Sequence, residues 1–167
     1  MKKLLVIDYK DYTENMPIFE KHTVRAVIRK GDKIAMQKSR RGEYKMLGGV
    51  VEEGESHLDT LIREVAEEGG MLVLPETVKE IGYIKEKRRD VFDKSRIYVC
   101  FTYFYYCDVA EEMVPLKLTA CEAAKGYEPV WETPKHIVAS NQHIIRERWK
   151  MRDTMFVNLL AEGKIQK

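Results

Sequence analysis

Three glutamates in the middle of the chain have the spacing that places side chains on one arc of a helix. Glu64, Glu67 and Glu68 stand at positions i, i+3 and i+4, and at about 100° per residue this keeps their carboxylates together. Like charges at this spacing repel by roughly a few tenths of a kcal/mol per pair, so they require a counter-ion. Carboxylate oxygens without a His or Cys partner favour Mg²⁺ or Mn²⁺ over Zn²⁺. The cluster therefore predicts a divalent-cation site; the alternative is a solvated acidic face of the helix.

The segment before these glutamates adds groups that suit an ion or a phosphate. Gly48 and Gly49 let the backbone approach such a group where a side chain would block it. Arg63 has two candidate partners, Glu67 along the helix and Glu55 in the preceding loop. Either pairing would hold the acidic face in register.

This stretch resembles the Nudix box at every defined position. The match consists of Gly49, five residues, Glu55, seven residues, Arg63-Glu64-Val65, one residue, Glu67-Glu68, one residue and Gly70-Met71. One departure is Leu47, which stands where the family often has a proline and bears on loop stiffness rather than on a ligand. The resemblance implies an α/β fold, an α/β/α sandwich with a mixed β-sheet. It also implies hydrolysis of a pyrophosphate bond in a nucleoside diphosphate linked to a group X, with Mg²⁺ as the cofactor and Mn²⁺ as a substitute.

The resemblance assigns roles to individual residues. Glu67 and Glu68 would bind the metal, with the Gly48 carbonyl as an additional ligand. Glu64 would be either a metal ligand or the base that activates water. Arg63 and Glu55 would complete the catalytic set as a structural ion pair.

Four residues outside the box are further candidates for the site. Many Nudix enzymes draw a metal ligand or base from a separate loop, and here Glu122 or Glu128 could serve, with Glu122 slightly favoured. Arg40 and Arg41 lie between a predicted strand and the box, where an arginine could contact a substrate phosphate through two parallel hydrogen bonds. A solvent-exposed turn is an equally good interpretation of this arginine pair.

The intact glutamates favour an enzyme over a catalytically silent Nudix module that binds a nucleotide as a sensor or scaffold. Subfamily marks are absent, because neither the proline of ADP-ribose enzymes nor the tyrosine of dinucleoside polyphosphate enzymes stands at the usual distance after the box. Lys87 and its neighbours occupy that region. Nucleoside triphosphates, including oxidised ones, and nucleotide sugars both stay open as substrates.

The hydrophobic pattern predicts the elements that position these residues. Ser56 can cap a helix, Asp59 completes an S-x-x-D capping box and Gly69-Gly70 can end the helix, which places the glutamates on a helix over residues 56–68. A segment at residues 97–109 is apolar on both faces and predicts a covered central strand. Two more helices are predicted, one from Pro134 and one over residues 143–162, together with strands at residues 4–7, 22–30, 34–36, 71–74, 78–86 and 128–131. This order indicates a single layered α/β domain over residues 1–167.

Other residue groups have a structural interpretation beside a functional one. Packing in the core is favoured over stacking on a base for Tyr103, Tyr105 and Trp131. Packing on the sheet or against a second copy of the chain, which keeps a homodimer open, is favoured for Trp149, Met151, Met155 and Phe156. A solvated hairpin tip is predicted for the basic run Lys87 to Arg89, and surface positions for His57 and His136.

Composition limits the class of protein. The length of 167 residues fits one domain. The net charge of +2, from 29 basic and 27 acidic residues, does not support a sequence-specific nucleic-acid binder. The partner that the resemblance implies is a small-molecule nucleotide substrate. The first apolar run is too short for a signal peptide, and no run approaches the ~20 residues of a membrane span. The odd number of cysteines, without a CxxC pair, predicts free thiols in a reducing cytoplasm for Cys100, Cys107 and Cys121.

Overall fold

The computed structural model describes residues 1–144 and 146–165. Its main sheet has four strands in the order β1 (Lys3–Asp8), β7 (Lys79–Arg89), β8 (Ile97–Tyr106) and β2 (Ile18–Val27). β1 runs parallel to β7 and β2 runs parallel to β8, whereas β7 and β8 are antiparallel. The sheet is therefore mixed, as predicted.

Smaller sheets flank the main sheet. The first joins β10 (Glu128–Glu132), β4 (Lys33–Lys38) and β3 (Arg29–Lys30), and β5 (Tyr44–Met46) also pairs with β4. The second joins β6 (Met71–Val73) and β9 (Val109–Met113). Because β5 leads directly into the loop before the box, its pairing with β4 fixes one end of that loop.

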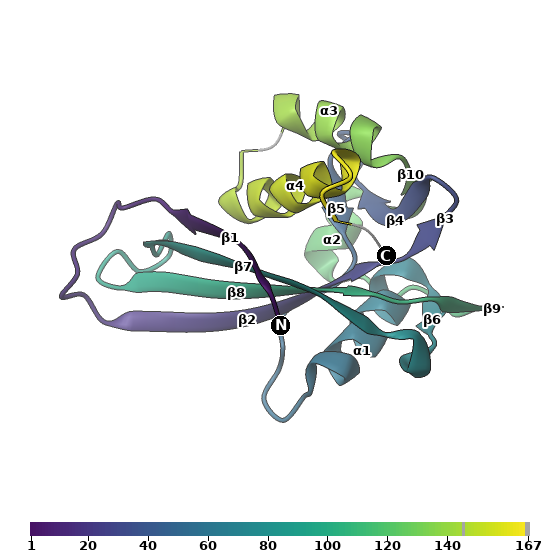
Figure 1. Cartoon of the computed structure of the whole chain (residues 1–167), viewed down its shortest axis with the longest axis horizontal. Coiled ribbons are helices and arrows are strands. Elements are labelled where there is room, and N and C mark those ends of the chain that lie inside the picture. The colour runs from purple at the N-terminus through teal and green to yellow at the C-terminus, as the bar shows by residue number, and fades with distance from the viewer. Residues whose placement is uncertain (145, 166–167) are drawn as a thin grey trace.

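Helices cover both faces of the main sheet. They are α1 (His57–Gly69), α2 (Ala120–Lys125), α3 (Pro134–Ile144) and α4 (Arg148–Ala161), with a 3₁₀ turn η1 at Pro75–Thr77. Figure 1 shows α1 on one side of the main sheet and α3 and α4 on the other. This arrangement confirms the α/β/α sandwich. Among the described residues, no helix combines the length and the apolar composition that a bilayer span requires.

The core consists of two hydrophobic clusters, one on each face of β8. Phe104 packs toward α4, where its ring stacks on Phe156 with the centroids 3.7 Å apart. The neighbouring Tyr105 belongs to the opposite cluster, together with Leu61 and Val65 of α1. Successive strand residues point to opposite faces, so β8 is buried on both sides. The prediction of a covered central strand is confirmed.

The helix that carries the box follows its sequence signals closely. The Ser56 side chain accepts a hydrogen bond from the Asp59 N–H, and the Asp59 carboxylate accepts one from the Ser56 N–H. At the other end, Gly70 adopts the left-handed conformation with φ of 65°, which glycine reaches without steric cost. The predicted helix over residues 56–68 is confirmed.

Several predicted boundaries differ from the structure. The strand predicted at 22–30 is divided into β2, which begins at Ile18 and ends at Val27, and β3, and the strand predicted at 78–86 continues to Arg89. The segment 143–162 is not one helix: α3 ends at Ile144 and α4 begins at Arg148, while residue 145 lies outside the described residues. Asn141 of α3 bonds to both backbone groups of Tyr44 in β5, and Phe156 of α4 packs on the main sheet. The strand predicted at 97–109 ends at Tyr106, after which the chain leaves for β9. The segment between the strand predicted at 34–36 and the box, for which no strand is predicted, contains β5 at Tyr44–Met46.

Candidate functional site

The loop before the box runs along β2. The N–H groups of Val24 and Ala26 donate to the carbonyls of Gly49 and Leu47, each at 2.9 Å, and the Val51 N–H donates to His22 at 3.0 Å. The Gly48 carbonyl lies between those of Leu47 and Gly49 and accepts no hydrogen bond from the described residues. It is therefore available to a ligand.

The two glycines of this loop are required for different steric reasons. A Cβ on Gly48 would lie 2.2 Å from the backbone oxygen of Val24, and Gly48 has φ of 129°, in the region that favours glycine. A Cβ on Gly49 would lie 2.1 Å from Glu64 Oε1. Gly48 thus permits contact with β2, and Gly49 makes room for a carboxylate of the box.

Arg63 holds the outer carboxylates of the box. Its Nε and Nη2 donate to the two oxygens of Glu55 at 2.6 and 2.9 Å, the two-point geometry that arginine favours. Its Nη1 donates to Glu64 at 2.8 Å and to Glu67 at 3.4 Å. The hydrogen bonds from Arg63 lower the pKa of Glu55 to about 2. Both partners considered for Arg63 are therefore in contact with it.

Glu68 points into the protein interior. Its residue surface is only 3% exposed, and its Oε2 accepts a hydrogen bond from the Gly48 N–H at 2.9 Å. Its Oε1 contacts the ammonium group of Lys45, which comes from β5. Burial raises the pKa of Glu68 to about 7, and Lys45 opposes this rise only in part.

Glu122 reaches the same lysine from α2. Lys45 Nζ donates to Glu122 Oε1 at 2.6 Å, and the other carboxylate oxygen accepts from the N–H and hydroxyl of Thr119 at 3.0 and 2.9 Å. Burial would raise the pKa of Glu122, but the hydrogen bond from Lys45 and its positive charge bring it to about 2. Burial likewise disfavours the charged form of Lys45, yet the attraction of Glu68 and Glu122 raises its pKa.

These groups border one cavity of about 430 Å³. It is lined by every predicted metal-binding residue and by Arg63, that is by Gly48, Arg63, Glu64, Glu67, Glu68 and Glu122. Glu55 acts from outside the lining through Arg63. Glu128 is exposed at the start of β10 and pairs with Lys38 in the sheet, so the structure favours Glu122 as the acid from outside the box.

The donor set suits a hard divalent cation, since it consists of four carboxylates and one free carbonyl. In the part of the chain that the structure describes, however, no three Asp, Glu, His or Cys side chains converge closely enough to hold an ion as they stand. The reason is electrostatic: Arg63 and Lys45 already neutralise these carboxylates. A bound cation would have to take over some of these contacts.

Arg40 and Arg41 lie apart from this cavity. Both are exposed and line a separate pocket with Lys125 and Glu147. The backbone of Arg40 is fixed by a hydrogen bond of 3.0 Å to the Lys125 carbonyl. The structure does not bring them to the box, and their contact with a phosphate stays a prediction.

Several residues of the cavity escaped the sequence analysis. They are Arg25, Lys45, Lys117, Thr119 and Trp149. Thr119 had a readable signal, because Thr119 and Glu122 form the same four-residue capping box as Ser56 and Asp59. Trp149, predicted to pack on the sheet or a partner, instead borders the cavity.

The aromatic residues of β8 have structural roles on the face toward α1. Tyr105 is buried, and its hydroxyl lies 2.6 Å from His57 Nδ1. The Tyr103 ring lies beside the same histidine, tilted by 39°, with the ring centroids 4.3 Å apart. Trp131 packs against the same cluster. The preference for core packing is confirmed, whereas His57 is half-buried rather than a surface residue, because these rings enclose it.

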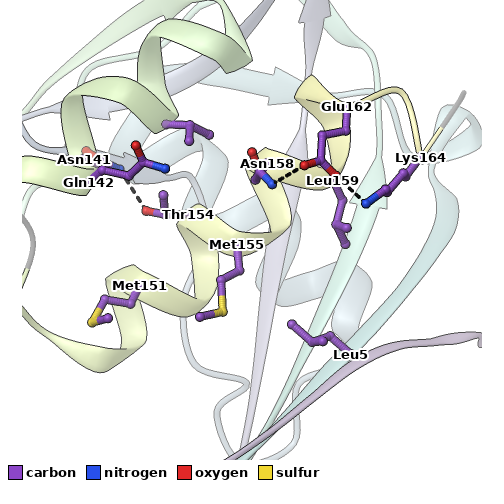
Figure 2. A pocket seen from close by; sticks show the side chains of 11 residues that line it. Leu5, Asn141, Gln142, Met151, Thr154, Met155, Asn158, Leu159, Glu162 and Lys164 are labelled. Carbon is purple, nitrogen blue, oxygen red and sulfur yellow. Dashed lines mark hydrogen bonds and ion pairs between the residues drawn. The ribbon is translucent and has the colours of Figure 1, made fainter.

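The last helix also lines a groove of about 470 Å³ on another part of the surface. Figure 2 shows Met151 and Met155 on successive turns of α4, with Leu5 of β1 opposite them. Met151 is 39% and Met155 is 40% exposed, whereas Phe156 is fully buried on the sheet. Of the four residues predicted to pack on the sheet or against a second copy of the chain, Phe156 lies in the core on the sheet. Packing against a second copy stays a prediction.

Comparison with known proteins identifies the family. The family model described as "NUDIX domain" matches residues 20–151, which include the whole box. A solved structure of a NUDIX hydrolase from Nitrosomonas europaea is similar, with 24% identity and a TM-score of 0.59, over 86% of this chain and 90% of that chain. An ADP-ribose pyrophosphatase from Streptococcus suis has 20% identity and a TM-score of 0.49, over 69% of this chain and 75% of that chain. A MutT protein from Bacillus halodurans has 19% identity and a TM-score of 0.48, over 72% of each chain.

No curated protein matches the chain. The likeness to the Nitrosomonas structure supports the fold alone, so the family rests on the matched domain, which spans most of the sequence. Gly49, Arg63 and the three helical glutamates of the box border one cavity in this structure. The chain belongs to the Nudix family.

Proposed function

We propose that this protein is a divalent-cation-dependent hydrolase that cleaves the pyrophosphate bond of a nucleoside diphosphate linked to a further group X. The observation that carries the proposal is the convergence of the Gly48 carbonyl and of Glu64, Glu67, Glu68 and Glu122 on one cavity. An acidic helix face that served only solubility would not need a buried glutamate. Glu68 is buried and bonded to the loop of the box.

Magnesium is the proposed cofactor, with manganese as a substitute, because all the available donors are hard oxygens. Glu67, Glu68 and the Gly48 carbonyl would hold it, and Glu122 would add a ligand from α2. A bound cation of this kind lowers the pKa of a water molecule and neutralises phosphate charge.

The chain's own residues would orient the reactants. Glu64 is held at 2.8 Å by Arg63 and faces the cavity, a position from which it could accept a proton from water or bind metal. The bidentate contact with Glu55 fixes the Arg63 guanidinium. Arg25 and Lys117 add positive charge to the cavity wall, which suits the phosphates of a substrate.

A panel assay that measures the formation of nucleoside monophosphate tests the proposal, because cleavage of the pyrophosphate bond releases a nucleoside monophosphate and phosphorylated X. Nucleoside triphosphates, oxidised nucleoside triphosphates and nucleotide sugars would be offered with Mg²⁺, with Mn²⁺ and with EDTA. We expect turnover of at least one compound with either metal and none with EDTA.

Two variants separate the site from the rest of the surface. Glu68→Gln should lower turnover by about a hundredfold or more, because it removes a buried charge from the proposed metal site. The matched control Glu128→Gln changes an exposed glutamate outside the cavity and should leave turnover unchanged. Tight nucleotide binding without turnover of any compound would contradict catalysis and favour a silent binding module.

A further inference from the structure

A second and larger cavity adjoins the one that contains the box. Its volume is about 590 Å³. Arg25, Val50 and Trp149 line both cavities, so a ligand seated among the box residues can extend into the second space. We call this second space the basic cleft.

The basic cleft forms where three distant segments meet at one end of the main sheet. These are β2 from Phe19 to Arg25, the β7–β8 turn with the strand ends beside it, and residues 146–152. The pairing of Ile97 with both Ile18 and Arg89 brings the strand ends together. Figure 1 shows the β7–β8 turn and the start of β2 at the same end of the sheet.

The lining of the cleft is strongly cationic. Nine of its 19 residues are Lys or Arg, and three are Asp or Glu. Two buried acids behind the lining, Glu86 and Asp153, pair with arginines of the cleft. When they are included, nine basic residues stand against five acidic ones. The whole chain, by contrast, carries a net charge of only +2. Such local concentration of one sign in a concave site attracts a ligand of the opposite sign.

Several of these cations are fixed in place before any ligand arrives. Arg88 is 6% exposed, donates to Glu86 at 2.6 Å and lies over the Tyr98 ring at 4.0 Å. Arg96 donates to Asp90 at 2.6 Å and lies over the Phe19 ring, also at 4.0 Å. The prediction that the run Lys87 to Arg89 lies at a solvated hairpin tip is therefore wrong, because these residues belong to β7 and Arg88 is buried.

Two lysines of the cleft are not neutralised in this way. In the described part of the chain, neither Lys21 of β2 nor Lys94 of the β7–β8 turn forms an ion pair. An ammonium group without a carboxylate partner is the simplest protein contribution to an anion site. Their removal also leaves no carboxylate without its partner.

We propose that the basic cleft binds phosphate carried by the X group, so that the substrate bears phosphate beyond the bond that is cleaved. This inference rests on the proposed function, since it assigns the charge of X. With the pyrophosphate among the box residues, the part of the substrate that passes Arg25 and Trp149 enters a cationic space. A phosphorylated X is stabilised there by Lys21 and Lys94, whereas an uncharged sugar gains nothing from these two charges.

The first test measures binding without turnover. Inorganic tripolyphosphate would be titrated into the protein by calorimetry in EDTA. The double variant K21Q/K94Q should bind it about tenfold or more weakly than the wild type, because each nearby charge contributes about 1 kcal/mol even in water. The double variant K33Q/K79Q is the charge-matched control, since both lysines are exposed and outside the cleft, and it should bind like the wild type. Equal binding by the two double variants would overturn the proposal.

The second test compares two substrates that share the same ADP portion. The double variant K21Q/K94Q should raise KM for ATP, where X is a phosphate, by about tenfold, and leave KM for ADP-ribose unchanged. An equal change for both substrates would overturn the cleft's role while leaving the hydrolase intact. Conversely, a selective loss of tripolyphosphate binding in a protein without metal-dependent turnover would support the cleft and contradict the proposed function.

Discussion

The ammonium group of Lys45 contacts the carboxylate of Glu68 in the interior of the protein. The same group lies 2.6 Å from Glu122. The three side chains are 10%, 5% and 15% exposed, so two carboxylates are buried around one lysine. Without a cation between them they would repel each other in a poorly solvated site. Lys45 therefore supplies, within the chain, the positive charge that these two acids require.

Replacing Lys45 should make the stability of the protein depend on an added cation. Lys45→Met should lower the free energy of unfolding in EDTA by about 3 kcal/mol, because it leaves buried carboxylates without their partner. Mg²⁺ should raise the melting temperature of this variant more than that of the wild type, since no lysine competes for the acids. Thermal unfolding with and without Mg²⁺ measures both effects, with the exposed Lys33→Met as the control. Equal Mg²⁺ shifts in wild type and Lys45→Met would show that the lysine and the metal do not share a site.

The raised pKa of Glu68 predicts an unusual dependence of stability on pH. Its pKa is about 7 in the folded protein and 4.5 ordinarily. Between these values the folded state binds the extra proton, so this group's contribution to stability falls as the pH rises from about 4.5 to about 7 and is constant above. Glu122 titrates below this window, because its pKa is about 2.

Chemical denaturation of the metal-free wild type and of Glu68→Gln across this range isolates the effect. The wild type should lose stability relative to the variant as the pH rises, because glutamine does not titrate. A constant difference between the two proteins from pH 4.5 to 7 would contradict the buried, proton-binding state of Glu68.

Arg63 should support both the stability and the chemistry of the box. Arg63→Ala should lower the melting temperature by roughly 2–4 °C at neutral pH, about the effect of losing a partly exposed bidentate ion pair. Turnover should also fall, because Glu64 loses its partner at 2.8 Å.

Melting temperatures measured at acid pH test whether Glu55 is the partner through which Arg63 stabilises the protein. Glu55 has a pKa of about 2 instead of 4.5, so the pair stabilises the protein above pH 4.5 and loses its effect as the pH falls toward 2. The melting temperatures of wild type and Arg63→Ala should therefore converge over that interval. Parallel curves down to pH 2 would exclude Glu55 as the partner that matters.

The paired glycines of the loop should respond differently to alanine. In Gly48→Ala the new Cβ meets the backbone oxygen of Val24 at 2.2 Å and φ is unfavourable, so we expect a loss of about 2 kcal/mol or more in unfolding free energy. In Gly49→Ala the obstacle is the movable carboxylate of Glu64. Gly49→Ala should keep most of its stability and lose turnover. Urea unfolding with a turnover assay distinguishes the two, and the reverse order would mean that the loop does not lie against β2 as described.

Local signals explain why so much of the fold could be predicted. The capping residues Ser56 and Asp59, the left-handed Gly70 and the fixed spacing of the box are all encoded within a few residues of one another. The main strands were recognisable for the same reason, since alternation of apolar residues is a local property. The arrangement of these elements in an α/β/α sandwich was predicted from the resemblance to the Nudix family, because no local pattern specifies how the layers pack.

The remaining part of the site depends on contacts between distant segments. Lys45 and Glu122 are 77 positions apart, and nothing near either residue indicates that they meet. Arg88 stands in a run of charges typical of a solvated turn, yet Glu86 and the covering α4 bury it within β7. The contacts that place α3 and α4 are also distant in sequence, since Asn141 bonds to Tyr44 and Phe156 stacks on Phe104.

The loop that presents Gly48 also has a protective effect on the sheet. β2 is an outer strand of the main sheet, and an uncovered outer strand invites pairing with another polypeptide. From His22 to Ala26 the backbone groups that would otherwise be open bond to Leu47, Gly49 and Val51. Substitutions that detach this loop should therefore promote aggregation as well as loss of activity, because they uncover a ready template for strand addition.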